Sequence, residues 1–228
     1  RLENPKIYGQ VILFTDVSKL AQPLEELLKY NQQSLQDQEI CYEGNVRKAK
    51  ELEELVESSK EVITPYKENS IYLITGGAGG LGLIFAKDII EKTKYATVIL
   101  TGRSELSSAT QSELTSLQTL AATTQSKVEY FQTDITNKDS LNSLIKTIQN
   151  NYGTLSGIIH AAGIIKDNFI LKKSSEEFNS VLLPKVQGTL NLDELTKDIN
   201  LDFFVLFSSV AGVMGNLGQA DYATGNAF

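Results

Sequence analysis

The stretch Ile71 to Gly82, Ile-Tyr-Leu-Ile-Thr-Gly-Gly-Ala-Gly-Gly-Leu-Gly, decides the fold. Its first four residues predict a short buried strand, and the apolar run Leu83 to Ile90 behind the glycines predicts a helix. Gly77, Gly79 and Gly82 fit the spacing G-x-G-x-x-G, which permits a sharp turn, close approach of the backbone to a pyrophosphate, and tight helix packing. The same spacing, taken alone, also fits a glycine-rich surface turn.

From Ile71 onward, the sequence alternates between strand and helix patterns. We expect strands at 71–75, 97–101, 127–132, 156–161 and 202–208, and helices at 81–92, 110–123, 138–151 and 175–196. This alternation is typical of an α/β fold with a Rossmann-like, doubly wound parallel sheet and right-handed crossovers. Ligands of such sheets bind beyond the carboxyl ends of the strands.

The first part of the chain has an α/β pattern without a glycine fingerprint. We expect a strand at 10–16, a helix at 20–30 entered at Pro23, a strand at 39–42 and a helix at 46–58 with one apolar face. Residues 1–66 are therefore interpreted as a small α/β lobe with no nucleotide site of its own. Residues 67–228 then form the larger, cofactor-binding domain, with 64–70 as the connection.

The end of the second strand of the larger domain bears on cofactor choice. It reads Thr101-Gly102-Arg103-Ser104, about twenty residues after the third glycine, where a carboxylate would hold the 2′-hydroxyl of NAD. Arg103 stands there instead, and a guanidinium can form charge-assisted bonds with a 2′-phosphate. The sequence therefore favours NADPH, although Arg103 also fits an ordinary exposed loop residue.

The third and fourth strand ends complete the expected cofactor site. Asp134 could accept a bond from the adenine amino group or cap the next helix. The small residues after His160 would let a flat ring lie close to the backbone, and His160 itself, without a nucleophile motif nearby, is expected to be structural. The expected cofactor-binding residues are Thr75, Gly76, Gly77, Gly79, Gly80, Leu81, Gly82, Arg103, Ser104, Asp134, Ile135, Ala161, Ala162 and Gly163.

Composition excludes several classes of function. The net charge of -7 argues against nucleic-acid binding, and a single cysteine, Cys41, with a single histidine argues against a disulfide or a zinc site. No apolar run approaches the roughly 18 residues of a membrane span, and the N-terminus lacks the charged and apolar regions of a signal peptide, so we expect a cytoplasmic protein. Because the first residue is Arg1, we expect a piece of a longer polypeptide.

The end of the chain carries a family resemblance. Phe207-Ser208-Ser209 and the segment up to Asn226, with the glycine stretch and His-Ala-Ala-Gly, resemble the short-chain dehydrogenase/reductase superfamily. Within it, the chain is similar to the ketoreductase domains of modular polyketide synthases. The resemblance covers residues 71–228 closely. The first lobe is a weaker match to the degenerate structural subdomain that precedes the catalytic half in those enzymes. The resemblance implies that this lobe is a truncated structural subdomain and that the larger domain is the catalytic one.

The resemblance implies a catalytic set. The superfamily's reactive tyrosine follows its serine by thirteen positions, as Tyr222 follows Ser209. Asn226 stands where most members have a lysine, and the ketoreductases take theirs from Pro-Lys-Val-x-Gly, matched here at Lys185. Tyr222 would donate a proton, Lys185 would lower the pKa of its phenol, Ser209 would bind the carbonyl oxygen, and Asn226 would hold Lys185 or a water. Taken singly, Lys185 also fits a solvated lysine, and Asn226 a chance neighbour.

The implied reaction is NADPH-dependent reduction of a β-ketoacyl group tethered to an acyl carrier protein, beside other polyketide synthase domains in one polypeptide. Asp167 matches the last residue of the Leu-Asp-Asp motif of ketoreductases that yield the D-hydroxyl, although it also fits a solvated loop carboxylate. The opposite class carries a tryptophan near Met214, and this chain contains none. The resemblance therefore implies a D-configured product.

Two alternatives remain at this point. One is a non-catalytic structural or docking domain of a polyketide synthase. The other is a fatty-acid-type 3-oxoacyl carrier protein reductase, which the extra lobe and Asn226 disfavour. The chain stops at Phe228, inside the tyrosine helix, so we expect its C-terminal strands to be missing, an exposed sheet edge, and poor catalysis by this fragment alone.

Overall fold

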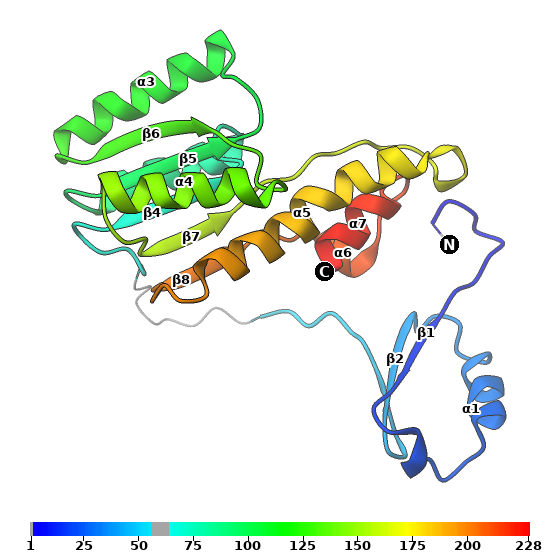
Figure 1. The fold of residues 1–228 in the computed structure, drawn as a ribbon. Coiled ribbons are helices and arrows are strands. Elements are labelled where there is room, and N and C mark those ends of the chain that lie inside the picture. Colours follow the sequence, from blue (N-terminus) through cyan, green and yellow to red (C-terminus); the bar gives the residue numbers. More distant parts are fainter. Residues whose placement is uncertain (1, 56–63) are drawn as a thin grey trace. The chain divides into compact units, whose positions relative to one another are not determined.

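A computed structural model describes residues 2–55 and 64–228. The chain divides into two compact units, Arg1–Val62 and Ile63–Phe228, and Figure 1 shows the elements of each. No helix in the described part of the chain is both long and apolar enough to cross a bilayer.

The first unit is a three-stranded sheet with one helix against it. Its elements are β1 (Val11–Phe14), the 3-10 helix η1 (Val17–Lys19), α1 (Leu24–Asn31), β2 (Glu39–Glu43) and β3 (Val46–Ala49). Strand β2 is central, parallel to β1 and antiparallel to β3. Leu27 of α1 packs with Ile40 and Tyr42 of β2 in a small core.

The expected helix at 46–58 is wrong at its start. Residues 46–49 form β3, a strand that pairs with β2 after a two-residue turn, and residues 50–55 have no regular structure. Gly44 occupies the left-handed region at φ 59°, which glycine adopts without strain, and Gly44-Asn45 thereby turns the chain back on itself. The rest of the expected helix, at 56–58, lies outside the described residues.

The second unit confirms the predicted α/β fold. Its elements are β4 (Ile71–Thr75), α2 (Gly80–Lys92), β5 (Thr97–Gly102), α3 (Ser108–Thr123), β6 (Lys127–Gln132), α4 (Lys138–Asn151), β7 (Gly157–His160), η2 (Ile170–Lys172), α5 (Ser175–Thr196), β8 (Phe203–Leu206), α6 (Val210–Met214) and α7 (Ala220–Ala227). The expected strands and helices agree with these bounds to within two residues. All five strands are parallel, in the order β6-β5-β4-β7-β8.

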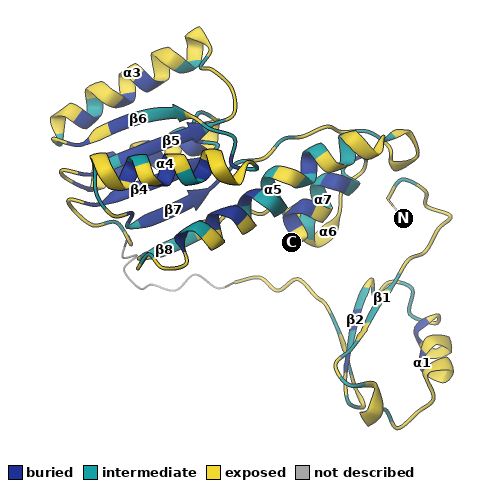
Figure 2. Ribbon diagram, viewed as in Figure 1, coloured by how far each residue is buried: buried dark blue, intermediate teal, exposed yellow. Residues whose placement is uncertain are grey.

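The sheet is buried on both faces because alternate residues of its strands enter different cores. In β4, Tyr72 and Ile74 pack with α2 and α3, whereas Ile71 and Leu73 pack with α4 and α5. Figure 2 shows the central strands dark blue beneath helices with exposed outer faces. Successive residues of this strand are apolar because helices cover both faces of the parallel sheet.

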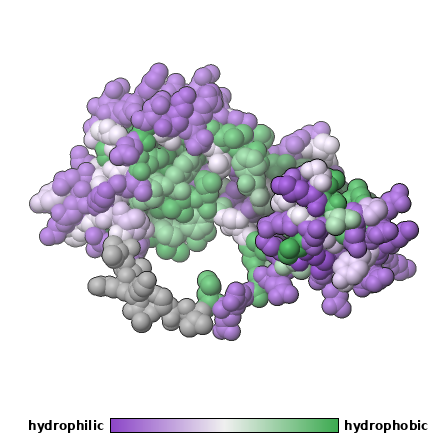
Figure 3. All heavy atoms as spheres, turned by 90° about the horizontal axis from the view of Figure 1, so that it is seen from below, coloured by the Kyte–Doolittle hydropathy of each residue, from purple (hydrophilic) through white to green (hydrophobic). Residues whose placement is uncertain are grey.

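The strand order creates a switch point beside β4. The chain runs outward from β4 to β6 and then returns to β7 on the other side of β4, so the crossovers diverge between these two strands. Strand β8 pairs with β7 on one side only among the described residues, and its Val205 and Leu206 are exposed. Figure 3 shows apolar residues exposed on the face of the second unit that is turned toward the viewer.

Candidate active site

A crevice opens at the carboxyl ends of the central strands. It is a cavity of about 210 Å³ whose walls come from the segments after β4, β5, β6 and β7 and from α5. Its lining residues are Gly76, Thr101, Gly102, Arg103, Ser104, Thr133, Asp134, Ile135, Thr136, Ala162, Gly163, Ile164 and Pro184. Seven of the residues expected to bind a cofactor therefore come together, although they are distant in the sequence.

The glycine loop brings β4, α2 and the segment after β7 into close contact. Gly76 adopts φ 67°, and a Cβ at this position would lie 2.7 Å from the Cα of Ala162. A Cβ at Gly82 would lie 2.6 Å from the Cα of Gly77. Glycine is required at Gly76 and Gly82 because the backbones themselves are in contact.

The start of α2 is suited to a phosphate group. Gly79 precedes this 13-residue helix and offers no side-chain cap, so the first amides of the helix keep their hydrogen-bonding capacity. A Cβ at Gly80 would meet no atom within 4 Å, which leaves open space at the first turn. The loop and crevice thus fit a dinucleotide, with phosphates at the helix and a flat ring beside Ala162 and Gly163.

Arg103 and Asp134 lie on the β5 and β6 side of the crevice. Arg103 is exposed, and no carboxylate in the described part of the chain pairs with its guanidinium. Asp134 Oδ1 accepts hydrogen bonds from the Thr136 amide at 2.9 Å and the Thr136 hydroxyl at 2.8 Å. The cap of α4 is Asn137, so Asp134 shapes the preceding turn and does not cap the helix.

Lys185 is the buried cation of the site. It projects from the middle of α5, is 9% exposed, and donates a hydrogen bond of 2.6 Å from Nζ to the carbonyl of Phe207. A Cβ at Gly163 would lie 3.1 Å from Lys185 Cε, and one at Gly225 would lie 3.5 Å from Lys185 Cβ. The lysine therefore runs between the crevice and α7, and burial lowers the pKa of its ammonium group.

His160 occupies a structural position at the end of β7. It is 1% exposed, and its Nε2 lies 3.0 Å from the carbonyl of Pro184, which can only accept. Nε2 must therefore carry the proton, and Nδ1 accepts from the Thr75 hydroxyl at 2.6 Å. Burial and then the charge of Lys185 lower the pKa of His160 to about 4, so the ring is neutral near pH 7.

Helix α7 carries Tyr222 and Asn226 one turn apart. The Asn226 amide donates from Nδ2 to the Tyr222 carbonyl at 2.7 Å, while its buried Oδ1 has no partner among the described residues. Ser208 donates from Oγ to the Asn226 carbonyl at 2.5 Å and ties the segment after β8 to α7. Ser209 caps α6, where its Oγ accepts from the Ala211 amide at 3.2 Å.

The two residues expected to control stereochemistry, Asp167 and Met214, lie on different segments of the second unit. Both carboxylate oxygens of Asp167, in the loop after β7, accept from Gln219 Nε2 at 3.0 Å. Met214 ends α6 and is exposed. Gln219 immediately precedes α7, so Asp167 contacts the segment that leads into the helix of Tyr222.

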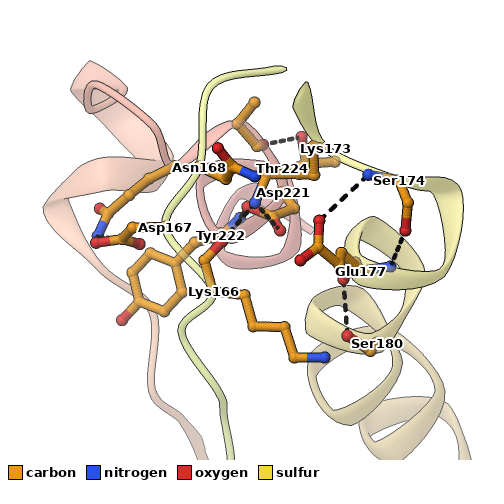
Figure 4. Close-up of polar contacts among 12 residues, drawn as sticks. Lys166, Asp167, Asn168, Lys173, Ser174, Glu177, Ser180, Asp221, Tyr222 and Thr224 are labelled. Carbon is orange, nitrogen blue, oxygen red and sulfur yellow. Dashed lines mark hydrogen bonds and ion pairs between the residues drawn. The ribbon is translucent and has the colours of Figure 1, made fainter. Parts of the chain in front are cut away.

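An ion pair that sequence reasoning missed lies beside Tyr222. Lys173 Nζ and Asp221 Oδ2 are 2.8 Å apart, and both side chains are 1% exposed. Figure 4 shows the pair at the start of α7. These residues are 48 positions apart, and nothing in the local sequence distinguishes either from a solvated charge.

A larger hollow lies away from this site. It has a volume of about 790 Å³ and opens between α3 and the edge strand β6, with Glu105, Gln118 and Glu129 among its lining residues. Its walls contain none of the residues expected to act in catalysis or cofactor binding. We therefore place the site in the smaller crevice at the carboxyl ends of the strands.

Comparison with known proteins identifies the family. Residues 70–228 match the profile of the KR domain. This chain belongs to the KR domain family. It is a ketoreductase domain of the polyketide synthase type, with the fold of the short-chain dehydrogenase/reductase superfamily and hence of a class of nicotinamide-dependent oxidoreductases.

The relatives are much longer than this KR domain sequence. Polyketide synthase PksN from Bacillus subtilis (strain 168) is 45% identical over 227 residues, which are 100% of this chain and 4% of PksN. PksL from the same organism is 48% identical over 227 residues, which are 100% of this chain and 5% of PksL. The crystal structure of a ketoreductase domain from the bacillaene assembly line superposes with a TM-score of 0.86 at 43% identity, covering 96% of this chain and 51% of that one.

Proposed function

We propose that the protein reduces the β-keto group of an acyl chain, carried on an acyl carrier protein, to a D-configured β-hydroxyl with NADPH. The observation that carries this proposal is the position of Lys185. Its stem lies between Gly163 of the crevice and Gly225 of α7, so one buried ammonium group connects the expected nicotinamide site with the tyrosine helix. Burying an ammonium group is costly, so this position favours a role in the site over that of an ordinary solvated lysine.

The described side chains can divide the reaction between them. A bound nicotinamide would supply a hydride to the carbonyl carbon. Tyr222 would give its phenolic proton to the carbonyl oxygen, and Ser209 would donate a hydrogen bond to that oxygen as its charge develops. The Lys185 ammonium would stabilise the phenolate that Tyr222 becomes. Asn226 Oδ1, buried without a partner, is suited to accept from Lys185 or from a water that returns the proton.

Arg103 supports NADPH as the reductant. The guanidinium is exposed beside the crevice, where it is free to bind a 2′-phosphate. Asp134, the acidic residue of the crevice lining, is engaged with Thr136 in the turn after β6.

Asp167 and the absence of tryptophan support the D-configured product. Asp167 is held by Gln219 on the loop that faces the start of α7, so it stands next to the segment that presents Tyr222. A carboxylate fixed at this position would guide the substrate into the crevice from one side. The sequence contains no tryptophan that would occupy the region near Met214.

The relatives of this chain suggest that it works beside other synthase domains. PksN and PksL are polyketide synthases of which this chain matches a small part. We propose that the KR domain likewise works beside other domains of one polypeptide, which deliver its carrier-bound substrate.

The test is NADPH oxidation by the full-length protein with a β-ketoacyl thioester, compared with Tyr222→Phe. Tyr95→Phe is the matched control, because Tyr95 is an exposed tyrosine in the turn before β5. We expect activity in the wild type and in Tyr95→Phe, and a loss of roughly 100-fold or more in Tyr222→Phe. NADPH binding without turnover on any ketone would instead support a non-catalytic structural domain.

A further inference from the structure

The Lys173–Asp221 pair differs from the other ion pairs described in the second unit. Those pairs, such as Lys92–Asp88 and Lys138–Glu194, have side chains exposed at 29% or more, whereas both members of this pair are 1% exposed. Removing two charges from water is costly, and their attraction offsets that cost only when the geometry is good. A buried pair therefore contributes more to fixing one arrangement than to overall stability.

Further hydrogen bonds connect each member of the pair to the backbone of its own segment. Besides the Asp221 carboxylate, the Lys173 ammonium donates to the carbonyl of Lys166. Asp221 Oδ1 accepts from the amide of Tyr222 at 2.8 Å. One buried carboxylate thus holds both the loop after β7 and the backbone of the reactive tyrosine.

Two further contacts join the same two segments. The backbone N–H of Asn168 donates to the Gly218 carbonyl at 2.9 Å, and the side chain of Gln219 donates from Nε2 to the Asp167 carboxylate. Gln219 is the N-cap residue of α7, but its side chain makes no capping hydrogen bond. The negative charge that favours the start of a helix comes instead from Asp221 in the first turn. The loop from Lys166 to Lys173 and the start of α7 are therefore fastened at three successive points.

We propose that Lys173 and Asp221 are positioning residues for ketoreduction, an inference that rests on the function proposed above. Their ion pair fixes the loop that carries Asp167 against the start of α7, so that the substrate enters on one side of Tyr222. Figure 4 shows the Tyr222 ring directed away from the pair. The pair consequently acts through the backbone of α7 and through Asp167, without touching the substrate.

The experiment compares Lys173→Met, Asp221→Asn and the double variant K173M/D221N in the full-length protein. The matched control is Lys138→Met, which removes an exposed ion pair with Glu194. For each folded variant, kcat/KM for a β-ketoacyl thioester, Kd for NADPH and the D-to-L ratio of the product are measured. A merely structural role would change the folded fraction and leave the product ratio as it is.

We expect the single variants to lose 10- to 100-fold in kcat/KM and to give a lower D-to-L ratio, with an unchanged Kd for NADPH. The double variant, which buries no unpaired charge, should recover part of the rate but not the product ratio. Lys138→Met should match the wild type in both.

Two results would overturn the inference. One is a folded double variant with the kcat/KM and the product ratio of the wild type. The other is failure of all three variants to fold, which would assign the pair to the folding core. If the wild type itself reduces no ketone, the proposed function fails, and that result is distinct from either of these.

Discussion

A methyl group at Gly82 would test how the glycine loop holds α2 against β4. In Gly82→Ala the new Cβ would lie 2.6 Å from the Gly77 Cα and 2.7 Å from the Gly76 carbonyl oxygen, whereas ordinary contacts begin at 3.4 Å. The atoms it would strike are backbone, so the helix and the loop must separate by roughly 0.8 Å, because no side chain can rotate away.

The expected cost follows from that overlap. Overpacking of this kind costs about 1–3 kcal/mol, and the better helix propensity of alanine returns at most about 1 kcal/mol. Because the clash is with backbone, we take the upper half of that range, about 2–3 kcal/mol, and expect a net loss of about 1–2 kcal/mol in the free energy of unfolding. In a domain of this size such a loss lowers Tm by roughly 2–8 °C. The displaced loop should also weaken NADPH binding about tenfold, since 1.4 kcal/mol corresponds to that factor.

Gly80→Ala is the matched control in the same helix. A Cβ at Gly80 meets nothing within 4 Å, so we expect unchanged or slightly raised stability. Urea unfolding followed by circular dichroism measures the stability, and fluorescence titration measures NADPH binding. The close-contact argument is refuted if Gly82→Ala is as stable as Gly80→Ala and binds NADPH as tightly as the wild type.

Three further predictions follow from individual side chains. The pKa of His160 is about 4 in the folded chain and about 6.5 when the chain is unfolded, so the unfolded state binds more protons between these pH values. The free energy of unfolding should therefore fall by about 3 kcal/mol from pH 6.5 to pH 4. His160→Gln should remove that slope in urea titrations at successive pH values, and a slope that persists would contradict the assignment. Arg103→Gln should weaken NADPH binding roughly 10- to 100-fold and leave NADH binding unchanged by calorimetry; an equal effect on both cofactors would place the guanidinium away from the 2′-phosphate. Leu73 is 0% exposed, so Leu73→Ala should lower the free energy of unfolding by about 2–5 kcal/mol. Leu171 is 96% exposed, so Leu171→Ala should change it by no more than about 0.5 kcal/mol. Comparable losses in the two variants would be inconsistent with the described core.

The sequence predicted those parts of the fold whose signals are local. Ile71 to Ile74, followed by glycines, strongly favour a buried strand and a tight turn. The later strands and helices were predicted from the same kind of local pattern. Strand β3 was missed because the charged run after Val46 has a helical period, while the deciding signal was the short turn Gly44-Asn45. Turn chemistry outweighed periodicity there, since β2 offered an edge for pairing.

The sequence could point to candidate site residues where chemistry requires one residue type. The Ser209-to-Tyr222 spacing and the departure at Asn226 pointed to Lys185, and the structure places Lys185 between the crevice and α7. Contacts that depend on tertiary structure were not predictable. Lys173 and Asp221 each resemble a solvated charge in the sequence, and their burial depends on how the loop after β7 meets α7. The tautomer of His160 likewise required the position of the Pro184 carbonyl.

The most direct test of the proposed reaction is transfer of deuterium from the nicotinamide. The full-length protein would be given NADPH deuterated at C4 on the transferred face and a β-ketoacyl thioester, and the product would be analysed by mass spectrometry and chiral chromatography. We predict a D-configured β-hydroxyacyl product with deuterium on the β-carbon, formed by the wild type and lost in Tyr222→Phe. A protein that binds the cofactor and returns the ketone unlabelled and unreduced would contradict the assignment of this site as a ketoreductase.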